Sequence, residues 1–277
     1  MNLLFEIGTE ELPSWYVLSS WRDIAELTKT LLADAKIEHG EVQSYATPRR
    51  IAVIVHDIGA TSTKRTELKR GPAVSAAYDS EGKLTKAALG FAKANNVSPE
   101  SIIKQDTDKG SYIYAEISLG GQDVREILPN ILKEIVEKLP APRKMRWADV
   151  LTPFVRPVSW LVALLDKEVI PVEVAGVSSS NFTCGHRFLA PKPHELKNVK
   201  DYVKTLEKLS VIPDPKTREG RTLEAAQAAA EREGYSAESN EALLGDISHI
   251  VEYPVGILGN FDESYLELPE EVLATTM

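Results

Sequence analysis

Residues 143–165, RKMRWADVLTPFVRPVSWLVALL, join a cationic segment to a strongly apolar run. The run from Val158 to Leu165 has almost no polar atom, and it is bounded by Pro157 and by the pair Asp166-Lys167. A run of this length between turn signals favours a strand covered on both faces, although the pattern alone does not separate it from a buried helix. We expect this strand to fix the backbone from which the preceding cations project.

The segment before the strand carries four cations and an indole at positions where RNA could be contacted. Fixed cations beside an exposed aromatic ring suit phosphate and base contacts. The alternative is that the arginines only solvate the entrance to a core strand. Both interpretations stay open for Arg143, Lys144, Arg146, Trp147 and Arg156.

On the N-terminal side, the pattern predicts a β-α-β-β unit followed by a hairpin and a helix. Residues 3–7 form the first strand, apolar residues at helical spacing predict a helix from about 14 to 35, and 51–58 is rich in branched residues. Alternating residues on both sides of 108–110 predict the hairpin. The polar run 61–70, TSTKRTELKR, is expected to be a loop or an edge strand. A strong apolar stripe predicts a helix from 123 to 139, which Pro140-Ala141-Pro142 would end.

On the C-terminal side, 158–165 and 168–175 are expected to form a hairpin. Helices are predicted at about 195–209 and 217–233, a strand interrupted by Pro254 within 247–258, and a last helix from Pro269. The predicted fold class is α+β, with mixed or antiparallel sheets packed with helices. We place the boundary between two subdomains near 140–142, which gives 1–142 and 143–277, because single cores tend to split above roughly 250–300 residues.

Composition limits the function classes. The chain has 277 residues and a net charge of −9, so any contact with nucleic acid must be a local basic patch whose affinity falls with salt. No stretch approaches the roughly 20 apolar residues of a membrane span, and the N-terminus is unlike a signal peptide. Cys184 is the single cysteine, which excludes an internal disulfide and suits a reducing cytoplasm.

Common catalytic motifs are absent from the sequence. It contains no GxxxxGK[ST], no GxGxxG after a strand and no GxSxG. None of the five histidines forms a pair at ligand spacing, so no metal site is predicted. His186, between Gly185 and Arg187, could act as an acid or base, but such a histidine is more often a hydrogen-bonded structural residue.

Seven motifs, in order along the whole chain, resemble the bacterial glycyl-tRNA synthetase beta subunit. They are MNLLFEIGTEELP at 1–13, TPRRIAV at 47–53, RGP at 70–72, KMRW at 144–147, FVRPVSWLVALL at 154–165, GHRFL at 185–189 and VEYPVGILGNFDESYLELPEEVL at 251–273. Members of that family are much longer, so the chain looks like an N-terminal fragment. The family usually has Gly at the position of Ala148, His at that of Ser159 and often Arg at that of Cys184.

The resemblance implies a function that depends on a partner. In this family the alpha subunit carries the aminoacylation site, which uses ATP with Mg and glycine, while beta is required for charging and engages tRNA(Gly). It also implies a cytoplasmic α2β2 heterotetramer and, within this chain, part of a module similar to the B3/B4 module of the phenylalanyl-tRNA synthetase beta subunit. No cofactor is expected in the fragment itself.

Three hypotheses follow for this chain. The first is a non-catalytic part of the ligase that binds tRNA and the alpha subunit, with a set of basic residues contacting phosphates and Trp147 offering a stacking surface. The second is a hydrolytic editing domain with His186 as acid or base, and the third is a scaffold that only docks on alpha. The basic residues of the first hypothesis are Arg49, Arg50, Arg143, Lys144, Arg146, Arg156 and Arg187.

Overall fold

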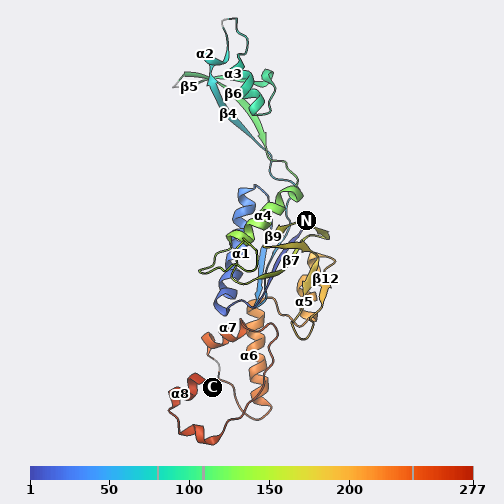
Figure 1. Cartoon of the computed structure of the whole chain (residues 1–277), viewed down its shortest axis with the longest axis vertical. Helices are drawn as coiled ribbons and strands as arrows, with labels where there is room; N and C mark the ends of the chain where they lie inside the picture. The colour runs from blue at the N-terminus through green and yellow to red at the C-terminus, as the bar shows by residue number, and fades with distance from the viewer. Residues whose placement is uncertain (80, 108–109, 239, 277) are drawn as a thin grey trace.

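A computed structural model describes residues 1–79, 81–107, 110–238 and 240–276. The molecule is elongated and has three parts along its long axis (Figure 1). We call 1–61 with 122–212 the body, 62–121 the lobe and 213–276 the C-terminal arm. The lobe and the arm lie at opposite ends of the body. Helices together with mixed or antiparallel sheets in the body and the lobe confirm the α+β class, and the described part of the arm is helical.

The body is built on one mixed sheet. Its strands run in the order β2-β3-β1-β7-β10-β9, with β8 paired to the end of β7. The first strand, β1, lies antiparallel between β3 and β7, whereas β10 runs parallel to β7. The strand bounds are β1 Leu3–Thr9, β2 Val42–Thr47, β3 Arg50–Val55, β7 Val158–Leu165, β8 Glu168–Val169, β9 Glu173–Val174 and β10 Val177–Ser180.

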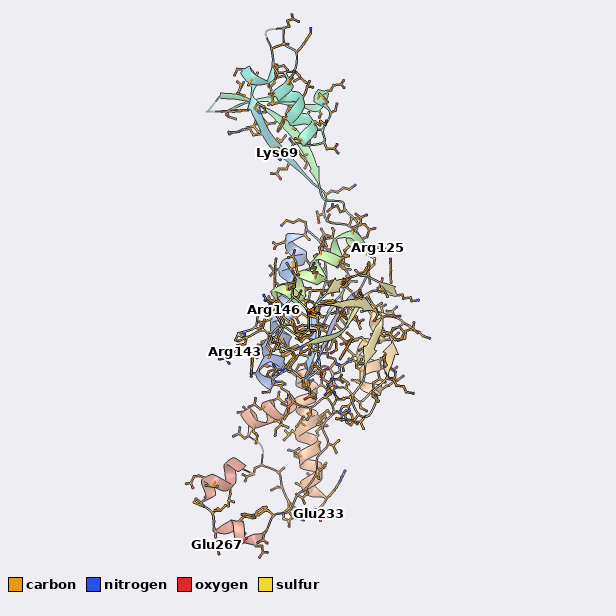
Figure 2. The ribbon with its side chains drawn as sticks, in the orientation of Figure 1. Lys69, Arg125, Arg143, Arg146, Glu233 and Glu267 are labelled. Carbon is orange, nitrogen blue, oxygen red and sulfur yellow. The ribbon has the colours of Figure 1, made fainter. Side chains whose placement is uncertain are left out.

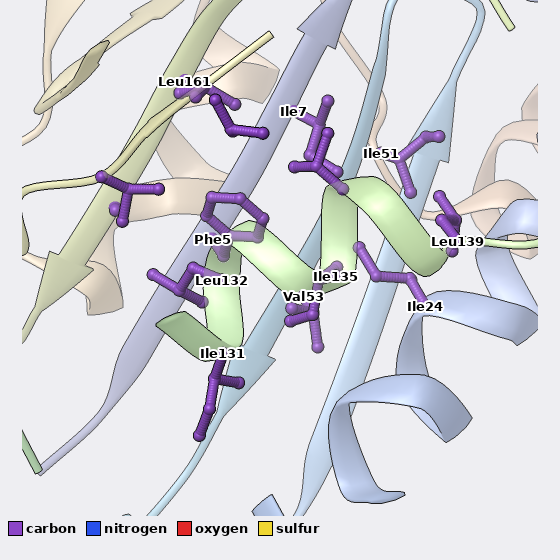
Figure 3. Close-up of a cluster of buried hydrophobic side chains, with 14 of the residues drawn as sticks. Phe5, Ile7, Ile24, Ile51, Val53, Ile131, Leu132, Ile135, Leu139 and Leu161 are labelled. Carbon is purple, nitrogen blue, oxygen red and sulfur yellow. The ribbon is translucent and has the colours of Figure 1, made fainter. Parts of the chain in front are cut away.

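One face of this sheet is covered by two helices, α1 (Ser14–Asp34) and α4 (Val124–Lys138). Alternate residues of β1, including Phe5 and Ile7, pack with Ile24 of α1 and Leu132 of α4 in the main core (Figure 3). Asp123 caps α4 by accepting a hydrogen bond from the amide of Arg125. This face confirms the two helices that the apolar stripes predict.

The other face is covered by shorter elements from the second half of the chain. They are β11 Phe182–Cys184, β12 Pro193–Glu195 and α5 Tyr202–Lys208, which a 3-10 turn at Val199–Asp201 precedes. Leu4 of β1, Val162 of β7 and Leu206 of α5 lie in a second buried cluster on this side. Since β1 and β7 are packed on both faces, their near-continuous apolar sequences are explained.

The lobe is a separate small α+β unit inserted between β3 and α4. Its sheet has the order β4-β6-β5, and its small core consists of Ala77, Ala88 and Ile113. The two connections to the body run side by side, with Ser62 and Gln122 hydrogen-bonded and Thr61 bridged to Asp123. The element bounds are β4 Arg65–Ala73, α2 Val74–Ala77, α3 Lys86–Ala94, a 3-10 turn at Pro99–Ser101, β5 Ile103–Thr107 and β6 Gly110–Leu119.

The C-terminal arm is helical. It comprises α6 Pro215–Glu231, α7 Glu241–Ser248, a 3-10 segment at Glu263–Glu267 and α8 Glu270–Thr276. Many of its large apolar side chains are exposed, and Ile257 is 85% exposed. Arg218 of α6 is buried and donates to the carbonyls of Ser248 and Ile212, both at 2.7 Å, which ties α6 to α7 and to the body.

Several predictions need correction. The ranges 1–142 and 143–277 share one sheet and one core, because β1 is hydrogen-bonded to β7 across the expected boundary. The segment that stands apart is the lobe, where 61–70 contributes an edge strand. The prediction of a strand within 247–258 is wrong, since α7 extends to Ser248 and no strand follows it among the described residues. The expected hairpin after Leu165 is limited to β8, and the helix at 195–209 begins only at Tyr202.

Candidate nucleic-acid interface

The basic segment 143–147 lies between the end of α4 and the start of β7. Its middle residue, Met145, is fixed by two backbone hydrogen bonds with Phe154, of 2.7 and 3.1 Å. Arg143 and Arg146 are exposed and lie on the same side of the body (Figure 2). Among the described residues, neither guanidinium has an ion-pair or hydrogen-bond partner. Two free cations therefore project from a constrained backbone.

The other residues of this segment are partly occupied by structural contacts. Lys144 is half-buried, its Nζ donates to the carbonyl of Glu137 at 3.0 Å, and burial lowers its pKa. Trp147 is half-buried and packs against the main core. Ala148 has a φ of 45°, which is the left-handed region that favours glycine. The segment thus presents two cations, while the indole is shared between core and surface.

Three further predicted residues lie elsewhere and already have partners. The guanidinium of Arg49 lies 5.4 Å from the ring centre of Trp160. Arg156 is half-buried and donates to the carbonyl of Val155 at 2.9 Å. Arg187 forms ion pairs with two carboxylates at 2.5 and 3.1 Å, those of Glu10 and Glu11. The structure therefore does not gather all the predicted cations into one patch.

Arg50 is buried, and the prediction that it contacts phosphate needs correction. Its side chain has no exposed surface, and its Nη2 lies 3.0 Å from a carboxylate oxygen of Glu252. Its Nη1 donates to the carbonyl of Cys184 at 2.7 Å and lies 3.6 Å from Glu6. With both ends of the guanidinium occupied inside the protein, Arg50 is unable to reach an RNA backbone in this conformation.

Glu6 is the second centre of this buried network. Its carboxylate accepts hydrogen bonds from Trp160 of β7, from Thr183 of β11 at 2.7 Å and from Tyr202 of α5 at 2.5 Å. A buried charge is costly unless it is paired and hydrogen-bonded, and Glu6 meets both conditions. The network therefore joins β1, β3, β7, β11 and α5 to Glu252, which follows α7 in the arm.

The electrostatics of the network follow from burial and pairing. Burial alone would raise the pKa of Glu252, but Arg50 and a hydrogen bond from Thr47 hold that pKa below its ordinary value. Burial opposes the charge of Arg50 as well, yet Glu252 and Glu6 raise its pKa. For Arg218 burial dominates and lowers the pKa to about 10. Arg50 and Glu252 are therefore held in their charged forms.

His186 has a structural role in this geometry. Its Nδ1 accepts from the amides of Phe188 and Leu189, both at 3.3 Å, and its ring packs near that of Phe188. Because Nδ1 faces two donors, it is occupied as an acceptor within the loop. Among the described residues no carboxylate bonds to the imidazole, so this arrangement supplies no acid–base pair for hydrolysis.

No cluster of metal-ligating side chains is found in the described part of the chain. Across the same residues, no helix has the length and apolar character needed to cross a membrane.

Sequence reasoning missed Glu6 and Glu252 as structural residues. Glu6 could have been found, because a carboxylate in the apolar run LLFEI requires a buried partner. Glu252 carries no such signal, since it lies in no apolar run of the kind that contains Glu6 and its partner Arg50 is 202 residues away.

The comparison with known proteins covers the whole chain. The sequence profile of the family described as "Glycyl-tRNA synthetase beta subunit" matches residues 3–277. Proteins named glycine–tRNA ligase beta subunit are 38% identical in Moorella thermoacetica over 276 residues and 40% identical in Nitratidesulfovibrio vulgaris over 277 residues. The chain is covered completely in both alignments but spans only 40% of each relative. The chain belongs to the glycyl-tRNA synthetase beta subunit family.

Proposed function

We propose that this chain is a non-catalytic part of a glycine–tRNA ligase, which supports the binding of tRNA(Gly) and assembly with an alpha subunit. In this proposal the alpha subunit attaches glycine to tRNA using ATP and Mg, and this chain holds no cofactor. The complete enzyme would be a cytoplasmic α2β2 tetramer. Family membership and the name that the relatives share support the proposal. A B3/B4-like module within the chain stays a prediction.

The observation that carries the RNA-binding part is the pair Arg143 and Arg146. Both are exposed, both lack partners among the described residues, and both follow a helix whose end is fixed in the core. Arginine is suited to phosphate because its guanidinium can donate two parallel hydrogen bonds. A local pair of this kind is consistent with RNA binding by a protein of net charge −9.

The test is tRNA binding by the assembled alpha–beta enzyme carrying Arg143→Ala and Arg146→Ala. Each lost phosphate contact is expected to weaken binding about fivefold to tenfold at 0.1 M salt, and the slope of log affinity against log salt should become shallower by about 1 per contact. The matched control is Arg125→Ala, which removes an exposed arginine of the body already paired with Glu168 and Asp123. Unchanged affinity and slope in the double variant would refute the assignment.

Assembly with the alpha subunit is tested separately by co-purification of tagged alpha with this chain. Retention of the chain is expected for the wild type and for the Arg143→Ala, Arg146→Ala variant, because these arginines are assigned to RNA. If alpha fails to retain the wild-type chain, the assembly part of the proposal is wrong for this region. The editing hypothesis has no comparable support, since Nδ1 of His186 is occupied by backbone amides.

A further inference from the structure

Among the described residues, helices of the lobe cover one face of its sheet only. In an antiparallel sheet, paired residues lie on the same face and successive residues alternate between faces. Ile113 and Ala115 of β6 are buried on the side of α2 and α3. The packing on that side is tight, because a Cβ added at Gly71 would approach Phe91 and Ile113 to 2.8–2.9 Å. The residues that alternate with Ile113 and Ala115 therefore lie on the opposite face.

That opposite face, which we call the open face, carries two tyrosines of β6 with apolar and cationic neighbours. Tyr114 is paired with Arg70 of β4 on one side and with Ile103 of β5 on the other. Leu68 lies two residues before Arg70 on β4, and therefore on the same face, and it is 50% exposed. Ile103 is 46% exposed. The set is completed by Tyr112, which is opposite Gln105, and by Glu116, which is opposite Leu68.

The chemistry of the open face suits a planar, anionic ligand. The guanidinium of Arg70 lies 4.5 Å from the ring centre of Tyr112, so a cation and an aromatic surface are held together. Two tyrosines at alternate positions of one strand lie roughly 6–7 Å apart along it, on the same face. The half-exposed side chains of Leu68 and Ile103, on the strands beside β6, favour a ligand that removes them from water.

The charge of the lobe favours RNA over other partners. Residues 62–121 contain nine lysines and arginines against seven aspartates and glutamates, so the lobe is net positive although the chain carries −9. An antiparallel sheet with helices behind it and aromatic rings on its free side is a known way to stack unpaired bases. The lobe also projects from the body on a narrow neck, which leaves this sheet remote from the body (Figure 1).

We propose that the open face binds unpaired nucleotides of RNA, with Tyr112 and Tyr114 stacking on two successive bases and Arg70 contacting the adjoining phosphate. This site is distinct from the segment 143–147. It deepens the proposed function and rests on it for the identity of the RNA as tRNA. Stacking is tolerant of base identity, so this contact positions the RNA and reads little sequence.

The experiment measures binding of a fluorescent, unstructured RNA decamer to the assembled enzyme by anisotropy, with an RNA duplex of equal length as the second probe. The variant is Tyr112→Leu with Tyr114→Leu, which keeps apolar bulk and removes the rings. Loss of two stacked bases is expected to weaken decamer binding at least about tenfold. The variant Tyr112→Phe with Tyr114→Phe should bind like the wild type, since the rings remain. Tyr235→Leu, at an exposed tyrosine of the arm, is the matched control and should change nothing.

The two proposals fail separately. Replacing Arg143 and Arg146 should weaken the binding of the duplex and of tRNA and leave the binding of the decamer unchanged. The Tyr112→Leu, Tyr114→Leu variant should weaken the binding of the decamer and leave the binding of the duplex unchanged. Hydrogen exchange of β4 and β6 shows whether the lobe stays folded in the Leu pair. A folded Leu pair with unchanged decamer affinity overturns the inference. If the Leu pair unfolds the lobe, the variant Arg70→Gln is used instead, because Arg70 is exposed and its replacement should leave the lobe folded. Decamer binding about fivefold weaker in this variant supports the inference, and unchanged binding overturns it.

Discussion

The body and the lobe both contain antiparallel strands, yet their sheets are used in different ways. The body sheet is packed on both faces, and its charged residues Glu6 and Arg50 are fully buried among partners. The lobe sheet is packed on one face, and its small core is formed by Ala77, Ala88 and Ile113 with partly buried neighbours. The buried charges of the body therefore stabilise the fold, whereas Arg70 and the tyrosine rings of the lobe lie on a sheet face that a ligand can reach.

The largest effect is expected for Arg50→Met. This change keeps much of the side-chain volume but leaves Glu252 and Glu6 buried without their cation, which should cost about 3–5 kcal/mol of unfolding free energy. Urea denaturation of the chain measures the loss. The matched change in the lobe, Arg70→Met, affects an exposed residue and should cost less than about 0.5 kcal/mol. Equal losses for the two variants would remove the contrast between body and lobe.

The next effect is expected for Ile113→Ala in the lobe. Removing the largest side chain of a small core should cost about 2–4 kcal/mol, close to the whole stability of such a unit. Hydrogen exchange should show lost protection in β4, β5 and β6, while β1 and β7 keep theirs. Loss of protection in β1 as well would show that lobe and body unfold as one unit.

A pH effect of intermediate size is expected in the body. Because the pKa of Glu252 is lowered in the folded state, its contribution to stability is present above its ordinary pKa of 4.5 and is lost as the pH falls below that value. The unfolding free energy measured between pH 7 and pH 3 should fall, and Glu252→Gln should flatten this dependence. An equally steep fall in the Gln variant would assign the acid sensitivity to other groups.

The smallest effect concerns one methyl group in each region. Ala148 of the body has a positive φ, so Ala148→Gly should stabilise the chain by roughly 0.5–1 kcal/mol. The same change at Ala115, in an extended strand of the lobe, should destabilise it by at least a similar amount. Thermal unfolding of both variants shows whether each change raises or lowers the stability of the chain. A loss at position 148 would show that the left-handed backbone there is not strained.

Local elements could be predicted from the sequence, whereas their assembly depended on contacts between distant residues. The stripes of α1 and α4 and the apolar run of β7 each carry a periodic signal. The pairing of β1 with β7 has none, because the two strands are about 160 residues apart and both are apolar on both faces. This is why the boundary was placed after α4, and why the lobe was not recognised as an insertion.

The candidate site shows the same limit. Charge alone nominated Arg50 and Arg143 equally, and only burial separates a structural arginine from an exposed one. The positive φ of Ala148 is a backbone conformation that favours glycine, which is the residue that the resemblance led us to expect at this position. The open face was hidden because 61–70 has too few apolar residues to predict which side of the strand is packed.

The neck of the lobe has a consequence for chain connectivity. Thr61 and Asp123 form a β-bridge, so the lobe is a loop whose two ends are held together at the surface of the body. The entropy of closing a loop grows only with the logarithm of its length, about 0.6 kcal/mol for each doubling. Sequences that lengthen, shorten or replace 62–121 should therefore leave the folding of the body nearly unchanged, and this site can accept a different module without redesign of the core.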